Sequence, residues 1–368
     1  MLNDTEALVI LTSIPHLGAV KSRLLIEHFG SASAALEADP VAVAALPDIG
    51  QKIAQSWSGW RQDKKWKRNL ELAKRHQVEI IPYTSSSYPK RLLELADHPI
   101  ILYVKGCMTA ADQNGIAVIG TRQATLYGLE MAKKIAEDLA AVGFTVISGL
   151  ARGIDTAAHA GALHARKGRT IAVIGSGLTN VYPRENIELS EAVANQGALI
   201  SEFPMETPPD RQNFPQRNRI VSGMTMATVL IEAPLQSGAM ITVEKALMQK
   251  RQVFALPGRA DHENFRGNHQ LLKQGKAHLV ENADDIINSF NDLFRRCGPS
   301  IPEQKPQCGM NPEERLFLSQ LPNHEISVEE IVQLTKLPVM RINILLMGLL
   351  LKKAVREFPG KIYKKVGV

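Results

Sequence analysis

The stretch of sequence from residue 116 to residue 177 decides the fold, and it reads IAVIGTRQATLYGLEMAKKIAEDLAAVGFTVISGLARGIDTAAHAGALHARKGRTIAVIGSG. Brief apolar runs alternate here with longer segments whose apolar residues recur at helical spacing. The same alternation continues downstream, and the apolar runs are 116–119, 144–147, 170–174, 228–231 and 252–255. Runs this short, without polar alternation, are typical of strands buried on both faces. The pattern therefore predicts an α/β fold with a parallel sheet wrapped by helices.

Two further apolar runs, 78–81 and 100–103, precede the first strand-to-glycine turn, and we expect them to extend the same sheet. Residues 78–292 are thus predicted to form one Rossmann-like domain. In such sheets the ligand crevice lies beyond the carboxyl ends of the strands. Glycine turns in this position are the first place to look for a site.

Residues 1–75 read as short helices. Two similar pieces, IPHLG at 14–18 and LPDIG at 46–50, resemble the hairpins of helix-hairpin-helix modules, in which glycine lets backbone N–H groups approach a phosphate. A small helical bundle with two tight turns explains them equally well. Residues 60–76 carry seven Lys or Arg against two acidic residues, with Trp60 and Trp66 interleaved, which also suits a solvated helix face.

The far end of the chain predicts a separate module. Residues 293–312 are rich in proline and glycine and read as a linker. Residues 313–368 give three helical patterns and then two short strands joined at Pro359-Gly360, the outline of a winged-helix domain. Winged helices bind duplex DNA or dock partner proteins, and the basic residues here do not separate those uses.

Composition limits the class of protein. The 368 residues are 45% hydrophobic, enough for a sizeable core, and the formal charge of +6 suits a polyanionic partner. Three cysteines without a CxxC pair argue against a disulfide framework or a zinc ribbon. Because the chain shows neither a basic leader nor an apolar run of roughly 18 residues, we expect a cytoplasmic protein that does not engage a membrane.

Three glycine-rich turns follow predicted strands and describe a floor for binding an anion, because glycines allow close approach of a phosphate and helix N-termini add partial positive charge. The residues concerned are Gly120, Thr121 and Arg122, then Ser148, Gly149, Ala151, Arg152 and Gly153, then Gly175, Ser176 and Gly177. Taken singly, each turn is also explained by the steric demands of a strand-to-helix connection.

The segment NFPQRNRI at 213–220 adds the side chains that suit an unpaired nucleic acid strand. Arginine forks bind phosphate oxygens, Phe214 offers a face on which a base can stack, and Asn218 can hydrogen-bond a base or the backbone. A structural alternative stays open, because Phe214 could be a core residue. In the same way, Arg217 or Arg219 could be the buried ion-pair partner of Glu202 or Glu232.

No cofactor, metal ion or catalytic residue is predicted. The turn at Gly175 lacks the third glycine of a dinucleotide fingerprint, since Asn180 stands in its place, and there is no phosphate-binding P-loop. The histidines lack the spacing of a zinc site. Asp155 lies at an expected helix start, where a carboxylate caps N–H groups, so its role is interpreted as structural.

These motifs, in this order, resemble the bacterial DNA processing protein A (DprA/Smf) family over roughly residues 80–290. The motifs that carry the resemblance are Tyr88-Pro89, Gly120-Thr121-Arg122, SGLARGID at 148–155, Gly175-Ser176-Gly177, Tyr182-Pro183, FPQRNRI at 214–220, Ser237-Gly238-Ala239 and Pro257-Gly258. The resemblance implies an extended Rossmann fold, a homodimer, binding of incoming single-stranded DNA during transformation, and loading of a RecA-type recombinase onto that DNA. It also implies a protein that is not an enzyme.

Two rival functions remain open. Rossmann-like phosphoribohydrolases, which are N-glycosidases, use a glycine turn followed by threonine and glutamate, and residues 237–244, ending in Glu244, are similar to that arrangement although the family's Pro-Gly-Gly string is missing. The other rival is a regulator that binds duplex DNA through its winged helix. Retention of DNA affinity after deletion of residues 310–368 would argue against the regulator.

Overall fold

The computed structural model of the protein describes residues 2–290 except position 48, and residues 312–365 except positions 323, 325, 352, 353 and 359–361. The chain divides into two compact units, Met1–Ser289 and Phe290–Val368. No described helix has both the length and the apolar character needed to cross a bilayer.

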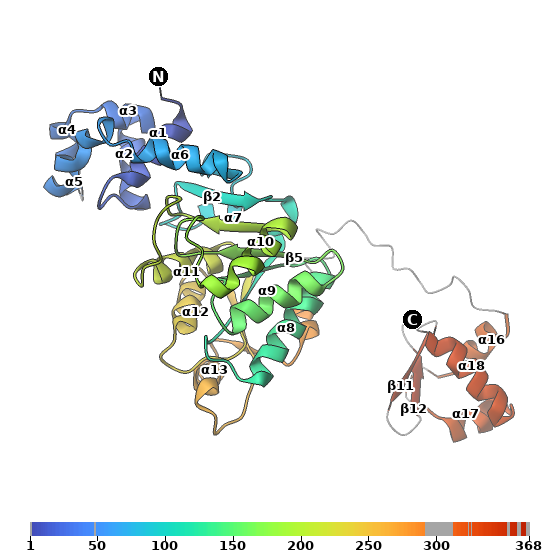
Figure 1. The fold of residues 1–368 in the computed structure, drawn as a ribbon. Helices are drawn as coiled ribbons and strands as arrows, with labels where there is room; N and C mark the ends of the chain where they lie inside the picture. Colours follow the sequence, from blue (N-terminus) through green and yellow to red (C-terminus); the bar gives the residue numbers. More distant parts are fainter. Residues whose placement is uncertain are drawn as a thin grey trace. The chain divides into compact units, whose positions relative to one another are not determined.

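A nine-stranded sheet forms the centre of the first unit (Figure 1), with the strand order β1-β2-β6-β5-β4-β3-β7-β8-β9. The strands are β1 (Val78–Pro82), β2 (Ile101–Gly106), β3 (Gly115–Ile119), β4 (Thr145–Ser148), β5 (Arg169–Val173), β6 (Ala198–Ser201), β7 (Ala227–Leu230), β8 (Gln252–Ala255) and β9 (His278–Leu279). The run from β6 to β9 is parallel, whereas β1 and β2 pair antiparallel. The predicted parallel core is confirmed, and the two early runs extend it: β2 runs opposite to the core strands, and β1 runs in their direction.

Side chains of β5 show how the sheet is covered on both faces, because neighbouring residues of a strand point to opposite sides. Ile171 and Val173 join a core cluster with Ile220 and Val243, whereas Ala172 joins another cluster with Val193 and Leu199. Two layers of helices therefore bury the strands. The helices and short helical turns of this domain are α7 (Lys90–Leu93), η2 (Ala110–Asn114), α8 (Leu126–Ala141), α9 (Ile154–His164), η3 (Arg184–Asn186), α10 (Ile187–Gln196), α11 (Asn213–Gly223), α12 (Gly238–Met248), η4 (Glu263–Phe265), α13 (Arg266–Lys273) and α14 (Ala283–Ser289).

The N-terminal helices pack directly on this domain. They are α1 (Asp4–Ser13), α2 (Ala19–Phe29), α3 (Ala32–Glu37), α4 (Pro40–Ala44), α5 (Gly50–Trp57), η1 (Ser58–Arg61) and α6 (Lys65–Arg75). Asn69 of α6 holds two separate parts of the sheet domain: its amide donates to the Tyr103 hydroxyl at 2.5 Å, and its oxygen accepts the Met205 N–H at 2.7 Å. Arg68 also pairs with Glu206 at 2.6 Å.

The first predicted hairpin turns toward the sheet domain. Gly18 and Ala19, at the start of α2, line a small cavity together with Glu202 and Arg219. This hairpin therefore lies next to the sheet domain. The second hairpin includes position 48, which lies outside the described residues.

In the second unit, α16 (Pro312–Gln320), β10 (Ile326–Ser327), α17 (Val328–Thr335), α18 (Val339–Leu351), β11 (Val355–Phe358) and β12 (Ile362–Lys365) follow one another, with the strand order β10-β12-β11. Phe317, Ile331, Ile342 and Leu346 form its core. The expected turn at Pro359-Gly360 and all but the last residue of the predicted linker 293–312 lie outside the described residues. Three helices and two late strands occur as expected, and the winged-helix assignment stays a prediction.

Candidate functional site

A cleft of about 680 Å³ opens at the carboxyl ends of β3, β4 and β7. The strand order reverses here, because β4, β5 and β6 lie on one side of β3 while β7, β8 and β9 lie on the other. This is the position predicted from the sequence. The cleft is lined by the predicted residues Gly120, Thr121, Arg122, Gly149, Ala151, Phe214, Arg217 and Asn218.

Arg122 is an exposed cation of the cleft. Its guanidinium lies over the ring of Phe214, 5.1 Å from the ring centroid. Arg122 is exposed, and within the part of the chain that the structure describes it has no acidic partner. Tyr182, whose ring centroid lies 6.0 Å from that of Phe214, is 38% exposed beside them. A charged fork next to aromatic rings can hold a phosphate and a flat group together.

Three backbone N–H groups of the first two turns, those of Thr121, Gly149 and Ala151, are already occupied. The buried carboxylate of Asp155 accepts the N–H of Gly149 at 3.1 Å and that of Ala151 at 3.3 Å. The N–H of Thr121 donates to the Glu232 carbonyl at 2.7 Å. Burial raises the pKa of Asp155, and the nearby Arg217 guanidinium acts in the opposite direction. These three N–H groups therefore do not belong to the expected floor of free amides.

Arg217 forms part of the cleft floor from below. It is only 4% exposed, and its Nη1 donates to the carbonyls of Gly149 and Val173. Burial lowers the pKa of Arg217 to about 10, so the side chain stays charged at neutral pH. Gly149 is required for this contact, because a Cβ atom there would overlap the Arg217 guanidinium. Arg217 is buried, as the structural alternative expected, but its hydrogen-bond acceptors are backbone carbonyls, and no described contact pairs it with Glu202 or Glu232.

Two further predicted arginines are neutralised. Arg219 is buried against Glu202, with Asp97 at 3.5 Å, and it lies outside the cleft. This corrects the expectation that the Arg219 fork binds a phosphate, and it bears out the ion-pair alternative with Glu202. Arg152 is exposed at the cleft margin, where it pairs with Glu185, and that pairing lowers the pKa of the carboxyl.

The third glycine turn is closed by protein. The Ser176 hydroxyl donates to the Asn180 carbonyl at 2.7 Å, the Gly177 N–H donates to the Thr207 carbonyl at 2.9 Å, and Gly175 packs against the Phe214 ring. The hydroxyl of Ser148 is also used internally, because it donates to the Val118 carbonyl at 2.7 Å. Ser148, Gly175, Ser176 and Gly177 are therefore not among the residues that line the cleft.

Gly153 is a structural requirement next to the site. It has a φ of +74°, and a Cβ atom there would overlap the Thr121 carbonyl oxygen. It lines a separate groove beside α8 and α9. Glycine is thus needed here for close packing of two turns.

The structure adds residues that the sequence reasoning missed. Arg211 is exposed and lines the cleft with no acidic partner among the described residues. Ser237 caps α12 by accepting the Met240 N–H at 3.4 Å, so the N-terminus of α12 borders the cleft, and Asn218 donates to the Gly238 carbonyl at 3.3 Å. The signal was the motif Ser237-Gly238-Ala239, in which a serine N-cap and a glycine predict a helix start.

Comparisons with known proteins agree with this architecture. Residues 79–291 match the family of DNA recombination-mediator protein A, and residues 8–70 match the helix-hairpin-helix motif. Protein Smf of Synechocystis sp. is 34% identical over 307 residues, which are 82% of this chain and 75% of that protein. DNA processing protein DprA of Bacillus subtilis is 38% identical over 224 residues, 61% of this chain and 75% of that protein.

Solved structures agree as well. DNA processing protein A from Streptococcus pneumoniae has a TM-score of 0.65 at 28% identity and covers 78% of this chain and 98% of its own. The Helicobacter pylori protein has a TM-score of 0.53 at 28% identity, with 59% and 97% covered. That second structure was reported for its single-stranded DNA binding mode.

Proposed function

Because this chain belongs to the DNA recombination-mediator protein A family, we propose that it binds single-stranded DNA in the cleft at the carboxyl ends of β3, β4 and β7. The role proposed for the protein is binding, not catalysis. It would protect incoming DNA and load a RecA-type recombinase onto it in the cytoplasm during transformation.

One observation carries the proposal: the unpaired guanidinium of Arg122 stacked on Phe214. A guanidinium without a carboxylate partner attracts phosphate, and aromatic rings accept the exposed faces of unpaired bases. In a duplex those faces are covered by neighbouring bases. Phe214 itself is enclosed by Arg122 and Gly175. The flat groups left for a base are therefore the Arg122 guanidinium and the 38% exposed Tyr182 ring, and these favour a single strand over a duplex.

The cleft has further features that suit a polyanion. Arg211 adds a second exposed cation, Arg217 adds buried positive charge beneath the floor, and the first turn of α12 has N–H groups with no partner inside the helix. The single-stranded DNA binding reported for the Helicobacter pylori relative supports the same ligand class.

The test is a fluorescence-anisotropy titration of the full chain with a labelled oligothymidylate, in competition with unlabelled single strand or with duplex of equal length. The single strand should displace the probe far better than the duplex. Log affinity should fall with log salt concentration by about 0.7 for each phosphate contact neutralised. Equal competition by the duplex would overturn the proposal.

Recombinase loading and homodimerisation rest on the family resemblance, and each has its own test. Loading predicts that the protein shortens the lag before a RecA-type recombinase begins to hydrolyse ATP on single strands covered by a single-strand binding protein. Dimerisation predicts twice the monomer mass of 40.4 kDa in sedimentation equilibrium. An unchanged lag, or a monomer at micromolar concentration, would remove the corresponding part of the proposal.

The structure gives the two rivals little support. Glu244, the carboxylate that an N-glycosidase would need, is exposed on α12 and does not line the cleft. Incubation with adenosine monophosphate should therefore release no adenine above background. The cleft lies wholly in the first compact unit, so deletion of residues 310–368 should leave single-strand affinity in place, whereas a regulator acting through the C-terminal unit would lose DNA binding.

A further inference from the structure

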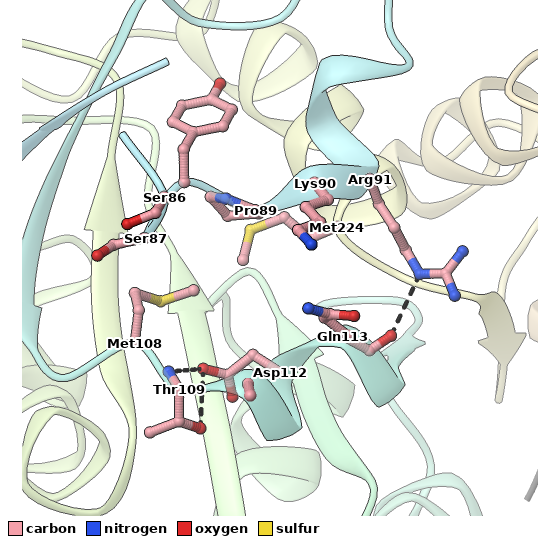
Figure 2. Close-up of a pocket in the computed structure, with 12 residues that line it drawn as sticks. Ser86, Ser87, Pro89, Lys90, Arg91, Met108, Thr109, Asp112, Gln113 and Met224 are labelled. Carbon is pink, nitrogen blue, oxygen red and sulfur yellow. Dashed lines mark hydrogen bonds between the residues drawn. The ribbon is translucent and has the colours of Figure 1, made fainter. Parts of the chain in front are cut away.

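A second cavity, of about 330 Å³, lies at the amino ends of β3 and β7, whose carboxyl ends border the cleft. Its residues come from the connection between β1 and β2, from the segment that leads into β3, and from Met224 just before β7. In Figure 2 the thioethers of Met108 and Met224 and the ammonium of Lys90 face the same open space. The proposed function makes no use of this cavity.

The charges around the cavity do not balance. Each of the two nearby acids already has an arginine of its own: Asp112 pairs with Arg169 at 2.5 Å, and Glu94 pairs with Arg251 at 2.8 Å. The Asp112 carboxylate also accepts the Thr109 N–H and the Thr145 hydroxyl. The negative charge of Asp112 is therefore neutralised by Arg169, and its carboxylate is hydrogen-bonded within the protein.

Two cations are left over. Lys90 is exposed and has no acidic partner among the described residues, and the Nε of half-buried Arg91 donates only to the Gln113 carbonyl at 3.2 Å. The pKa of Arg91 is lowered by its burial and then by the neighbouring Arg251 guanidinium, and Glu94, which pairs with Arg251, acts in the opposite direction. An anion beside Lys90 and Arg91 would offset the positive charge that remains.

The remaining lining adds two kinds of group. Ser86 and Ser87 present exposed hydroxyls that no described residue engages, and they lie at the end of the cavity away from Lys90 and Arg91, where they can donate to polar atoms of a ring. Met108 and Met224 form an apolar wall, and thioether sulfur packs favourably against aromatic rings. A ligand that satisfies both ends has a phosphate group at one end and a flat ring at the other.

We propose that this cavity binds a small phosphate monoester that carries an aromatic ring, of the size of a nucleoside monophosphate. Lys90 and Arg91 hold the phosphate, and the ring lies against Met108 and Met224, toward the end of the cavity where Ser86 and Ser87 lie. The volume is within the roughly 300–1,000 Å³ of small-molecule sites. The site is independent of the cleft that binds the single strand.

The test uses the full chain with ¹³C-labelled methionine methyl groups, because eleven methionines give few signals and two of them report on the cavity. Met108→Leu and Met224→Leu variants assign their resonances. Titration with thymidine monophosphate should shift both signals, inorganic phosphate should shift them less, and thymidine should leave them unchanged. Lys90→Glu should weaken the response to thymidine monophosphate by about tenfold or more.

Lys273→Glu is the matched control, since Lys273 is also exposed but lines neither cavity. Binding of oligothymidylate should be unchanged in Lys90→Glu, which also shows that the variant folds. The methyl signals report on the cavity whether or not the cleft binds DNA. The proposal is overturned if thymidine monophosphate leaves both signals in place, if inorganic phosphate acts equally well, or if Lys90→Glu responds like the unaltered protein.

Discussion

The guanidinium of Arg122 rests on the ring of Phe214, 5.1 Å from its centroid, and nothing acidic in the described chain neutralises it. Gly175 packs against the Phe214 ring as well. Phe214 is therefore fixed between a glycine turn and the arginine. These contacts hold the Arg122 guanidinium in position without neutralising its charge, as a phosphate-binding group requires.

Arg122→Ala should weaken binding of oligothymidylate by about ten- to a hundredfold near 0.1 M salt, because it removes one charge-assisted contact. The slope of log affinity against log salt should also become shallower by about 0.7. Arg166→Ala is the matched control, since Arg166 is exposed, unpaired among described residues and located before β5, away from the cleft. Equal affinities for the two variants would contradict the role of Arg122.

Arg152 and Glu185 give a prediction of opposite sign. The two side chains are paired and exposed, so Glu185→Gln should release the arginine and strengthen single-strand binding several-fold at low salt. Arg152→Ala should weaken binding less than Arg122→Ala does. Anisotropy titrations at two salt concentrations would measure both effects, and weaker binding by Glu185→Gln would count against a cationic margin at this place.

The apolar runs predicted five strands of the parallel core, β3, β4, β5, β7 and β8, because each run is mostly apolar and largely buried. They did not predict that β1 and β2 run antiparallel, since hydrophobicity contains no information on pairing direction. The strand β6 was missed because it is only four residues long, Ala198–Ser201, and begins directly after α10, which ends at Gln196.

The site was predicted less completely for a related reason. Arg217 and Arg219 stand in one short motif, yet the acids that neutralise or approach them, Asp155 and Glu202, come from other strand ends. Such partners are set by the tertiary fold and leave no mark on local spacing. Arg122 and Arg219 look equally available in the sequence, and only the packing separates them.

Removal of the Arg217 charge should destabilise the protein in a pH-dependent way. Burial raises the pKa of Asp155 and Arg217 opposes that rise, so Arg217→Met should raise the pKa of Asp155 further. A carboxyl whose pKa is raised in the folded state contributes most to the free energy of unfolding at pH values below its unfolded pKa. That contribution is lost as the pH rises through the folded pKa. The loss should therefore be about 3–5 kcal/mol at pH 8 and smaller at pH 5.

Urea denaturation followed by circular dichroism at both pH values would measure this difference. The double variant Arg217→Met/Asp155→Asn is the control, since it has no carboxyl left to titrate at this place. Its stability relative to the unaltered protein should change less with pH. A penalty for Arg217→Met that is equal at pH 5 and pH 8 would contradict the coupling.

His159 should make the fold sensitive to acid. It is fully buried, its Nδ1 lies 2.7 Å from the Thr170 hydroxyl, and burial lowers its pKa from 6.5 to about 3. A depressed histidine pKa means that the unfolded chain binds the proton first. The stability is thus complete above about pH 6.5 and falls by about 1.4 kcal/mol for each pH unit below it.

His159→Leu should reduce the loss of stability at acid pH, because leucine has no group that binds a proton. The variant should still fold, since the Thr170 hydroxyl keeps its hydrogen bond to the Val146 carbonyl at 2.8 Å. Thermal unfolding between pH 4 and pH 7 would show the difference from the unaltered protein. Parallel acid limbs in the two proteins would mean that His159 does not account for the loss.

Asn69 makes the cleft depend on a residue that never approaches a ligand. Its one amide fastens both Tyr103 in β2 and the Met205 N–H, and the chain runs from Met205 in six residues to Arg211 at the cleft. A protein shortened by its first 75 residues would lose Asn69, so the Tyr103 hydroxyl and the Met205 N–H would each lose this hydrogen bond. The segment 205–211, which ends at Arg211, would then be held less firmly. Shortened forms would therefore misreport the DNA affinity of the intact chain, and substitutions in α6 would mimic defects in the cleft itself.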